Sequence, residues 1–136
     1  MKKLTKEWVH KAEADYRAAG KLERGNDPLH DQACFHCQQC AEKYLKALLQ
    51  ELGLAIPRTH VLLNLLTLLL PHHPSLRSVR RGMDFLTRFA VDTRYPGDKA
   101  SKRQARAAFR WAGKVRDVAR QLLGLRPARK RRKKSP

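Results

Sequence analysis

One short segment of the chain holds three cysteines and a histidine whose spacing could bind a metal ion. They are Cys34, His36, Cys37 and Cys40. Cysteines three positions apart on a helix point about 60° apart, so the three thiols spread over about 120° and do not converge on one ion. A zinc ion needs four converging ligands, usually from two separate segments, and the sequence has no second cysteine pair. We therefore interpret the thiols as small core residues and predict no metal site.

The same segment carries a polar stripe on the opposite side of the expected helix. His36, Gln39, Lys43 and Lys46 recur at steps of three and four, which places them on one face. A stripe of this kind is usually a solvated face. On a central helix, which has little free surface, it would instead form the floor of a groove that binds a phosphate or a nucleobase. The sequence leaves both interpretations open.

A second candidate site lies at the corner before the last expected helix, in residues 92–96. Arg94 would lie beside the N-terminus of that helix, where free backbone N–H groups and the helix dipole favour anions. Its guanidinium adds a bidentate fork for phosphate, and Tyr95 would lie at the edge of the same groove. The alternative is that Arg94 pairs with Asp92 or Asp98 and only fixes the corner. We favour the phosphate-binding interpretation.

A stripe of basic residues follows along the last expected helix, opposite its core face. These residues are Lys99, Arg103, Arg106, Arg110 and Lys114, with almost no acid among them. Like charges at this spacing repel each other, and an anionic partner would relieve the repulsion. The stripe predicts a nucleic-acid surface that contacts phosphates rather than reading the base sequence.

Composition also favours a polyanionic partner. The chain has 136 residues and a formal net charge of +18. Residues 77–125 hold thirteen basic and four acidic residues, and residues 126–136 hold seven basic residues and no acid. Such an excess attracts nucleic acid, nucleotides or acidic surfaces. An odd number of cysteines, with no signal-like or membrane-spanning apolar run, indicates a cytoplasmic protein.

Hydrophobic periodicity predicts the elements that position these residues. We expect five helices and no strands, at about residues 5–23, 27–52, 59–70, 75–90 and 98–122. The expected N-terminal caps are Asp27, Thr59, Ser75 and either Asp98 or Ser101. Short loops imply antiparallel neighbours, so the predicted fold class is all-α, an up-down antiparallel bundle of four long helices plus one short helix. Residues 1–125 form the bundle, and residues 126–136 are expected to be a disordered basic tail.

Three segments, taken in order, resemble the HEPN domain family, small helical bundles of bacteria and archaea. They are the helical segment 33–49, the Pro-Arg-Thr-His-Val-Leu run at 57–62 and the Asp-Thr-Arg-Tyr-Pro run at 92–96. The resemblance covers roughly Trp8 to Leu123. It implies a HEPN-like fold, a homodimer and a partner chain of the minimal nucleotidyltransferase type.

The same resemblance implies a function. HEPN proteins with such a partner act as toxin–antitoxin pairs or as split nucleotidyltransferases, in which the HEPN chain is the substrate-binding half. We therefore expect a non-catalytic subunit that binds a nucleotide or an RNA phosphate. Its groove would have the polar stripe of residues 36–46 as its floor and Arg94 with Tyr95 at its edge. No cofactor is expected, because the sequence has no metal, flavin, nicotinamide or glycine-rich phosphate-loop signature.

Two alternatives stay open. Many HEPN proteins are metal-independent ribonucleases whose motif is Arg, four to six residues, then His, so this chain would be a divergent endoribonuclease that acts as a dimer. No His follows Arg94, although acid–base cleavage of RNA usually uses one. Arg24 and His30 have the spacing but lie between the first two helices, and we assign them no role. His36 or His60 would substitute only if the fold places one near Arg94. The other alternative is a structural dimerisation module without a ligand.

Overall fold

The structure is a computed structural model that describes residues 1–91 and 95–127. Over these residues it contains five α-helices, two short 3₁₀ segments and no strand. The α-helices are α1 (Lys3–Arg24), α2 (His30–Glu51), α3 (Leu62–Leu69), α4 (Arg80–Thr87) and α5 (Lys102–Leu122). The 3₁₀ segments are η1 (Pro74–Val79) and η2 (Arg88–Ala90). The predicted all-α fold class is confirmed, and none of the described helices is long and apolar enough to cross a membrane.

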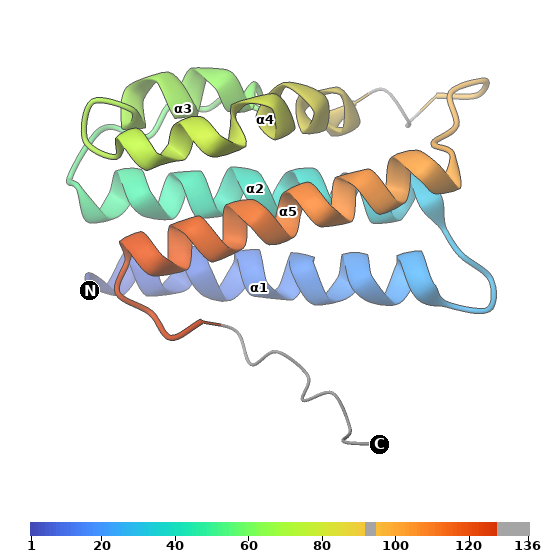
Figure 1. Cartoon of the computed structure of the whole chain (residues 1–136), viewed down its shortest axis with the longest axis horizontal. Coiled ribbons are helices and arrows are strands. Elements are labelled where there is room, and N and C mark those ends of the chain that lie inside the picture. Colours follow the sequence, from blue (N-terminus) through green and yellow to red (C-terminus); the bar gives the residue numbers. More distant parts are fainter. Residues whose placement is uncertain (92–94, 128–136) are drawn as a thin grey trace.

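Helix α2 lies at the centre of the bundle and contacts every other α-helix. Figure 1 shows α1 running antiparallel to α2 on one side, while α3 and α4 form a layer on the other side and α5 lies across the middle. The loop between α1 and α2 and the start of α5 lie at the same end of the molecule (Figure 1). That shared end brings together segments that are about 75 residues apart in the sequence.

The wide apolar face of α2 explains its central place. Cys34, Cys37, Cys40, Tyr44 and Leu48 are fully buried or nearly so, and the three cysteines are free thiols. Burial raises the pKa of Cys34 to about 12 and also raises the pKa of Cys37 and of Cys40. The interpretation of the cysteines as core residues is confirmed. Among the described residues, no group of three His, Cys, Asp or Glu side chains could hold a metal ion.

The helix starts follow the predicted caps in one case and differ in others. Ser101 caps α5, because its hydroxyl accepts a hydrogen bond from the Gln104 N–H while its own N–H donates to the Gln104 side chain. Helix α2 was expected to start at Asp27, but it starts at His30. The Leu29 N–H donates to the Leu22 carbonyl of α1, which ties the loop back before the helix begins.

The expected third and fourth helices are shorter than their periodicity indicated. Helix α3 begins at Leu62, because the Thr59 hydroxyl accepts from the Val61 N–H in a local turn instead of capping a helix. Helical turns do run from Pro74 to Ala90, but η1 and α4 meet at Val79. Its backbone angles, φ −106° and ψ 4°, lie outside the α-helical region and divide the two segments.

Candidate functional site

The polar stripe predicted on α2 makes its first set of contacts with α1. His36 Nδ1 lies 2.8 Å from one carboxylate oxygen of Asp15, and Lys43 Nζ lies 2.5 Å from the other. Asp15 itself is only 8% exposed, so its carboxylate depends on these two partners. The cluster holds α1 against α2 and offsets the charge of Lys43.

A second carboxylate, Glu42, gathers the remaining members of the stripe. Its oxygens lie 3.1 Å from Lys46 Nζ and 2.8 Å from His60 Nδ1, and they also accept a hydrogen bond from the Gln38 amide. Burial raises the pKa of Glu42, but the hydrogen bonds from His60, Gln38 and Lys46 outweigh it and hold that pKa below its ordinary value. The Gln39 side-chain amide in turn donates to the side-chain oxygen Oε1 of Gln38 at 2.7 Å.

All four stripe residues therefore contact protein groups, and both lysines have a carboxylate partner. This arrangement leaves little uncompensated positive charge for a phosphate at this surface. The groove edge predicted at Arg94 lies outside the described residues, whereas Tyr95 is 67% exposed. The role of these six residues in ligand binding stays a prediction.

Helix α5 carries two sets of basic residues with opposite surroundings. Arg116 donates to both carboxylate oxygens of Glu13, at 2.6 and 2.9 Å, and Arg120 lies 3.5 Å from the same carboxylate. The Tyr44 hydroxyl also donates to Glu13, so one acid on α1 joins α2 and α5. The charges of this first set are therefore paired with Glu13 inside the bundle and are not available to a ligand.

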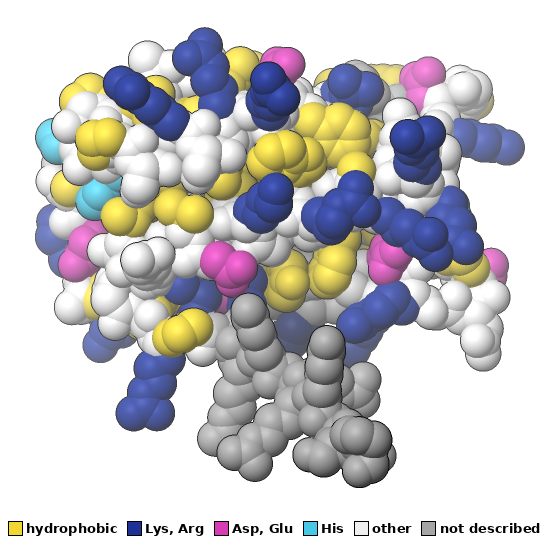
Figure 2. Space-filling model, viewed as in Figure 1, with side chains coloured by type: hydrophobic (Ala, Val, Ile, Leu, Met, Phe, Trp, Pro, Cys, Tyr) yellow, Lys and Arg dark blue, Asp and Glu magenta, His cyan; other side chains and the backbone are white. Residues whose placement is uncertain are grey.

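The second set is the predicted basic stripe, which we call the α5 basic face. Its members Lys99, Arg103, Arg106, Arg110 and Lys114 are all exposed. Lys99 was expected on the helix, but α5 starts at Lys102 because Ser101 is the cap, so Lys99 lies in the preceding loop. Figure 2 shows Lys and Arg side chains gathered over this side of the molecule with few acids between them.

The α5 basic face has one ion pair among the described residues, between Arg106 and Glu23. Its length, 3.9 Å, is near the limit for an ion pair, and the Arg106 side chain is 58% exposed. Arg103, Arg106 and Arg110 line a pocket of about 470 Å³ together with Lys102. No carboxylate lines this pocket, and three of its four cations have no ion pair among the described residues, while Arg106 has the long one to Glu23. The surface can bind phosphates through charge-assisted hydrogen bonds.

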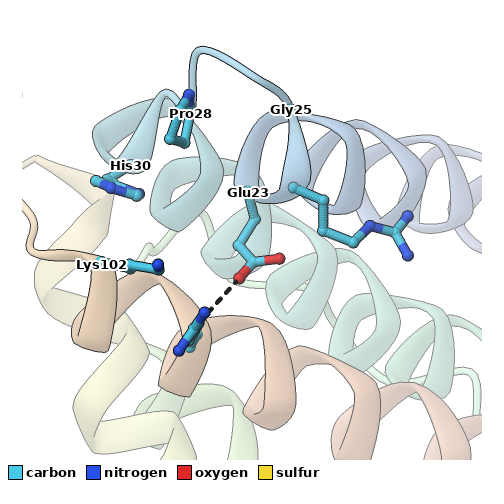
Figure 3. Close-up of a pocket in the computed structure, with 7 residues that line it drawn as sticks. Glu23, Gly25, Pro28, His30 and Lys102 are labelled. Carbon is cyan, nitrogen blue, oxygen red and sulfur yellow. Dashed lines mark ion pairs between the residues drawn. The ribbon is translucent and has the colours of Figure 1, made fainter.

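A neighbouring pocket of about 310 Å³ lies between the α1–α2 loop and the start of α5. Arg24 and His30, to which the sequence assigned no role, both line it, together with Lys102 and Arg106 (Figure 3). The Asp31 carboxylate accepts the Ala100 N–H at 2.6 Å, and this bond holds the start of α5 beside the start of α2. Sequence spacing signalled the Arg24–His30 pair but gave no sign that α5 lies next to it.

Comparison with known proteins agrees with the fold. Two solved structures are similar to the chain: ST0689, an archaeal HEPN homologue, and TT1696 from Thermus thermophilus. ST0689 has 27% identity and a TM-score of 0.71, over 90% of this chain and 99% of that one. TT1696 has 26% identity and a TM-score of 0.72, over 86% of this chain and 96% of that one. No curated protein matches the chain.

The family comparison covers most of the bundle. A model of the HEPN domain matches residues 5–122, which run from the first turn of α1 to the last residue of α5. The match includes the two carboxylate clusters and the whole of the α5 basic face. The chain therefore belongs to the HEPN domain family.

Proposed function

We propose that this chain is a cytoplasmic, non-catalytic HEPN subunit that binds RNA or nucleotide phosphates, and that the α5 basic face makes the contacts. The observation that carries the proposal is the contrast within α5. Arg116 and Arg120 have a carboxylate partner, whereas five exposed basic residues share one long ion pair among the described residues. Basic side chains that have no carboxylate partner within the bundle are available to bind a polyanion.

The proposed contacts are to phosphates rather than to bases. The aromatic side chain on α5 that contacts the face is Trp111; its ring centroid lies 4.7 Å from Lys114 Nζ and the residue is partly buried. A single-stranded nucleic acid that stacks its bases needs exposed aromatic platforms. Lysine and arginine side chains along one helix instead suit a backbone of repeated negative charges, which gives binding without sequence preference.

Family membership supports the partner part of the proposal. In this scheme the chain is a homodimer and its second partner is a minimal nucleotidyltransferase, in a toxin–antitoxin pair or a split nucleotidyltransferase. Size-exclusion chromatography with light scattering on the pure protein tests the dimer. Co-expression with a minimal nucleotidyltransferase, followed by purification through a tag on one chain, tests the complex, and recovery of the tagged chain alone would contradict it.

The binding surface is tested by comparing two variants with equal charge loss. One carries Arg103→Gln, Arg110→Gln and Lys114→Gln on the α5 basic face. The control carries Lys6→Gln, Lys11→Gln and Lys21→Gln, which are exposed positions on α1. Fluorescence anisotropy with a labelled single-stranded RNA at low salt should show a large loss of affinity for the α5 variant and a small loss for the α1 variant. Equal losses would show that only net charge matters and would overturn the assignment to α5.

The same preparation tests the ribonuclease alternative and the predicted groove. Incubation of labelled RNA in EDTA should leave it intact, because no His follows Arg94 in the sequence. Cleavage by the wild type that Arg94→Ala abolishes would make the protein an enzyme. If the groove contributes to binding, Arg94→Gln will weaken RNA affinity, and if it does not, the contacts are confined to α5.

A further inference from the structure

The pocket beside the start of α5 differs from the open face that follows it. It is bounded by the loop that carries Gly25 and Pro28, and in Figure 3 His30 and Lys102 lie on one side of it with Glu23 on the other. Its volume of about 310 Å³ is at the lower end of the range for small-ligand sites, about 300–1,000 Å³. The pocket therefore suits a small group rather than a folded partner.

The charge of the pocket favours an anion. Three permanent cations line it, Arg24, Lys102 and Arg106, against the single carboxylate of Glu23. The Arg106–Glu23 contact of 3.9 Å is long and the Arg106 side chain is 58% exposed, so the pair compensates only part of that excess. Lys102 is exposed and has no ion pair among the described residues. Arg24 is held at the wall, because its Nε donates to the Gly20 carbonyl at 3.0 Å.

His30 supplies an independent observation. Its Nδ1 atom is buried and has no hydrogen-bond partner within residues 1–91 and 95–127. Most buried polar atoms in proteins are paired, and an unpaired one is costly. His30 is also the first residue of α2, whose N-cap Leu29 makes no side-chain capping bond. The first N–H groups of α2 therefore add partial positive charge beside the imidazole.

A second feature shows where a longer ligand would continue. The pocket shares Lys102 and Arg106 with the neighbouring pocket of the α5 basic face, which Arg103 and Arg110 complete. An anionic group bound in this pocket would thus lie at one end of the row of basic side chains on the α5 basic face. A terminal phosphate carries more charge than an internal phosphodiester and leaves only one direction for the attached chain. Both properties match a basic pocket that opens onto a basic face.

We propose that this pocket binds the phosphate group of a phosphate monoester, with Lys102, Arg106 and the Nε2 atom of His30 as hydrogen-bond donors to its oxygens, since His30 Nδ1 is buried. The monoester is the 5′-phosphate end of an RNA or a free nucleotide, which share this chemistry. For RNA the proposal rests on the proposed function, because the strand would continue along the α5 basic face. For a free nucleotide or inorganic phosphate it stands alone.

The experiment uses two RNAs of one sequence, one with a 5′-phosphate and one with a 5′-hydroxyl. The wild-type protein should bind the phosphorylated RNA roughly tenfold more tightly, since charge-assisted hydrogen bonds of this kind change affinity by about that factor. His30→Gln and Lys102→Gln should each remove the preference. His30→Gln should leave affinity for the hydroxyl RNA nearly unchanged, whereas Lys102→Gln should also lower that affinity modestly, because Lys102 lines the pocket of the α5 basic face as well. His72→Gln and Lys11→Gln, both exposed and outside the pocket lining and the α5 basic face, are the matched controls. Equal affinity of the wild type for both RNAs would overturn the RNA-end assignment.

A second measurement separates this proposal from the proposed function. Inorganic phosphate and AMP are titrated into the protein at constant ionic strength, and the ring resonances of His30 are followed by NMR. A saturable shift that Lys102→Gln weakens supports the pocket even if neither RNA binds, in which case the proposed function fails and the free monoester is the ligand. No shift with either compound, while both RNAs bind alike, overturns the pocket and leaves the proposed function standing.

Discussion

Glu13 joins three helices, and replacing it with Gln should weaken the bundle strongly. Its carboxylate accepts two hydrogen bonds from Arg116 on α5, accepts one from the Tyr44 hydroxyl on α2, and lies 3.5 Å from Arg120. Glu13→Gln keeps the shape of the side chain but removes its charge. Arg116, whose side chain is only 14% exposed, would then lack a counter-ion.

The magnitude follows from these exposures. Removing one partner of a fully buried ion pair costs about 3–5 kcal/mol. The Glu13 side chain keeps 23% of its exposure, so water compensates part of the loss. A hydrogen bond to a charged group contributes about 1.5–3 kcal/mol, and the amide of Gln can replace only part of the bidentate contact. We therefore expect the free energy of unfolding to fall by about 2–3 kcal/mol at neutral pH.

The loss should depend on pH in a defined direction. Burial raises the pKa of Glu13, but the hydrogen bonds from Arg116 and Tyr44 outweigh it, so the pKa in the folded protein lies below its ordinary value. A carboxylate of this kind contributes its full stability above the pKa of the unfolded chain and loses it as pH falls through the folded pKa. The difference between wild type and Glu13→Gln should therefore shrink in acid.

Urea unfolding followed by circular dichroism, at neutral pH and at a series of acidic pH values, measures both effects. Glu7→Gln is the matched control, because Glu7 is exposed on α1 and has no ion pair among the described residues. Exposed substitutions of this type change stability by about 0.5 kcal/mol or less. If Glu13→Gln behaves like Glu7→Gln at neutral pH, or if its loss is the same at every pH, the reasoning about this cluster is wrong.

Three further predictions concern packing, thiols and capping. A Cβ at position 82 would overlap the Trp111 ring, so Gly82→Ala should destabilise by about 1–3 kcal/mol in urea unfolding, whereas Gly113→Ala, with its nearest contact at 3.4 Å, should not. The three cysteines should stay unreactive toward a thiol reagent at pH 8 until the protein unfolds, because burial raises their pKa, and rapid labelling of the native protein would contradict their placement. Ser101→Ala should cost about 1 kcal/mol through loss of the capping box with Gln104, and an unchanged urea midpoint would show that the box contributes nothing.

Features of the fold that depend on local sequence could be predicted. The spacing of Cys34, Cys37 and Cys40 placed them on the buried face of the central helix, and Ser101 was identified as a candidate cap. Both depend on residues within one or two helical turns, so periodicity is sufficient to find them. The division of the expected fourth helix at Val79 was not visible, because the backbone there responds to tertiary packing rather than to an evident breaker.

The candidate site was predicted only in part, because some of its contacts join segments that are far apart in the sequence. The α5 basic face could be found because its members repeat along one helix. The partner of Lys43 could not be found, since it is Asp15, 28 residues earlier in the chain. The Glu42–Lys46 pair, by contrast, has the i,i+4 spacing of a local helix pair. The pocket around His30 was missed because its walls come from the α1–α2 loop and from α5, which meet only in the folded bundle. Contacts between distant segments have no signature in a single sequence.

The salt dependence of RNA binding tests the central claim most directly. Each phosphate contact to a single strand contributes about 0.7 to the slope of log affinity against log salt concentration. If the α5 basic face binds phosphates, the triple variant Arg103→Gln, Arg110→Gln, Lys114→Gln should have a slope smaller than that of the wild type by about 2. The α1 triple variant should keep the wild-type slope. A slope that is unchanged in the α5 variant would contradict the account, because its three charges would then contact no phosphate.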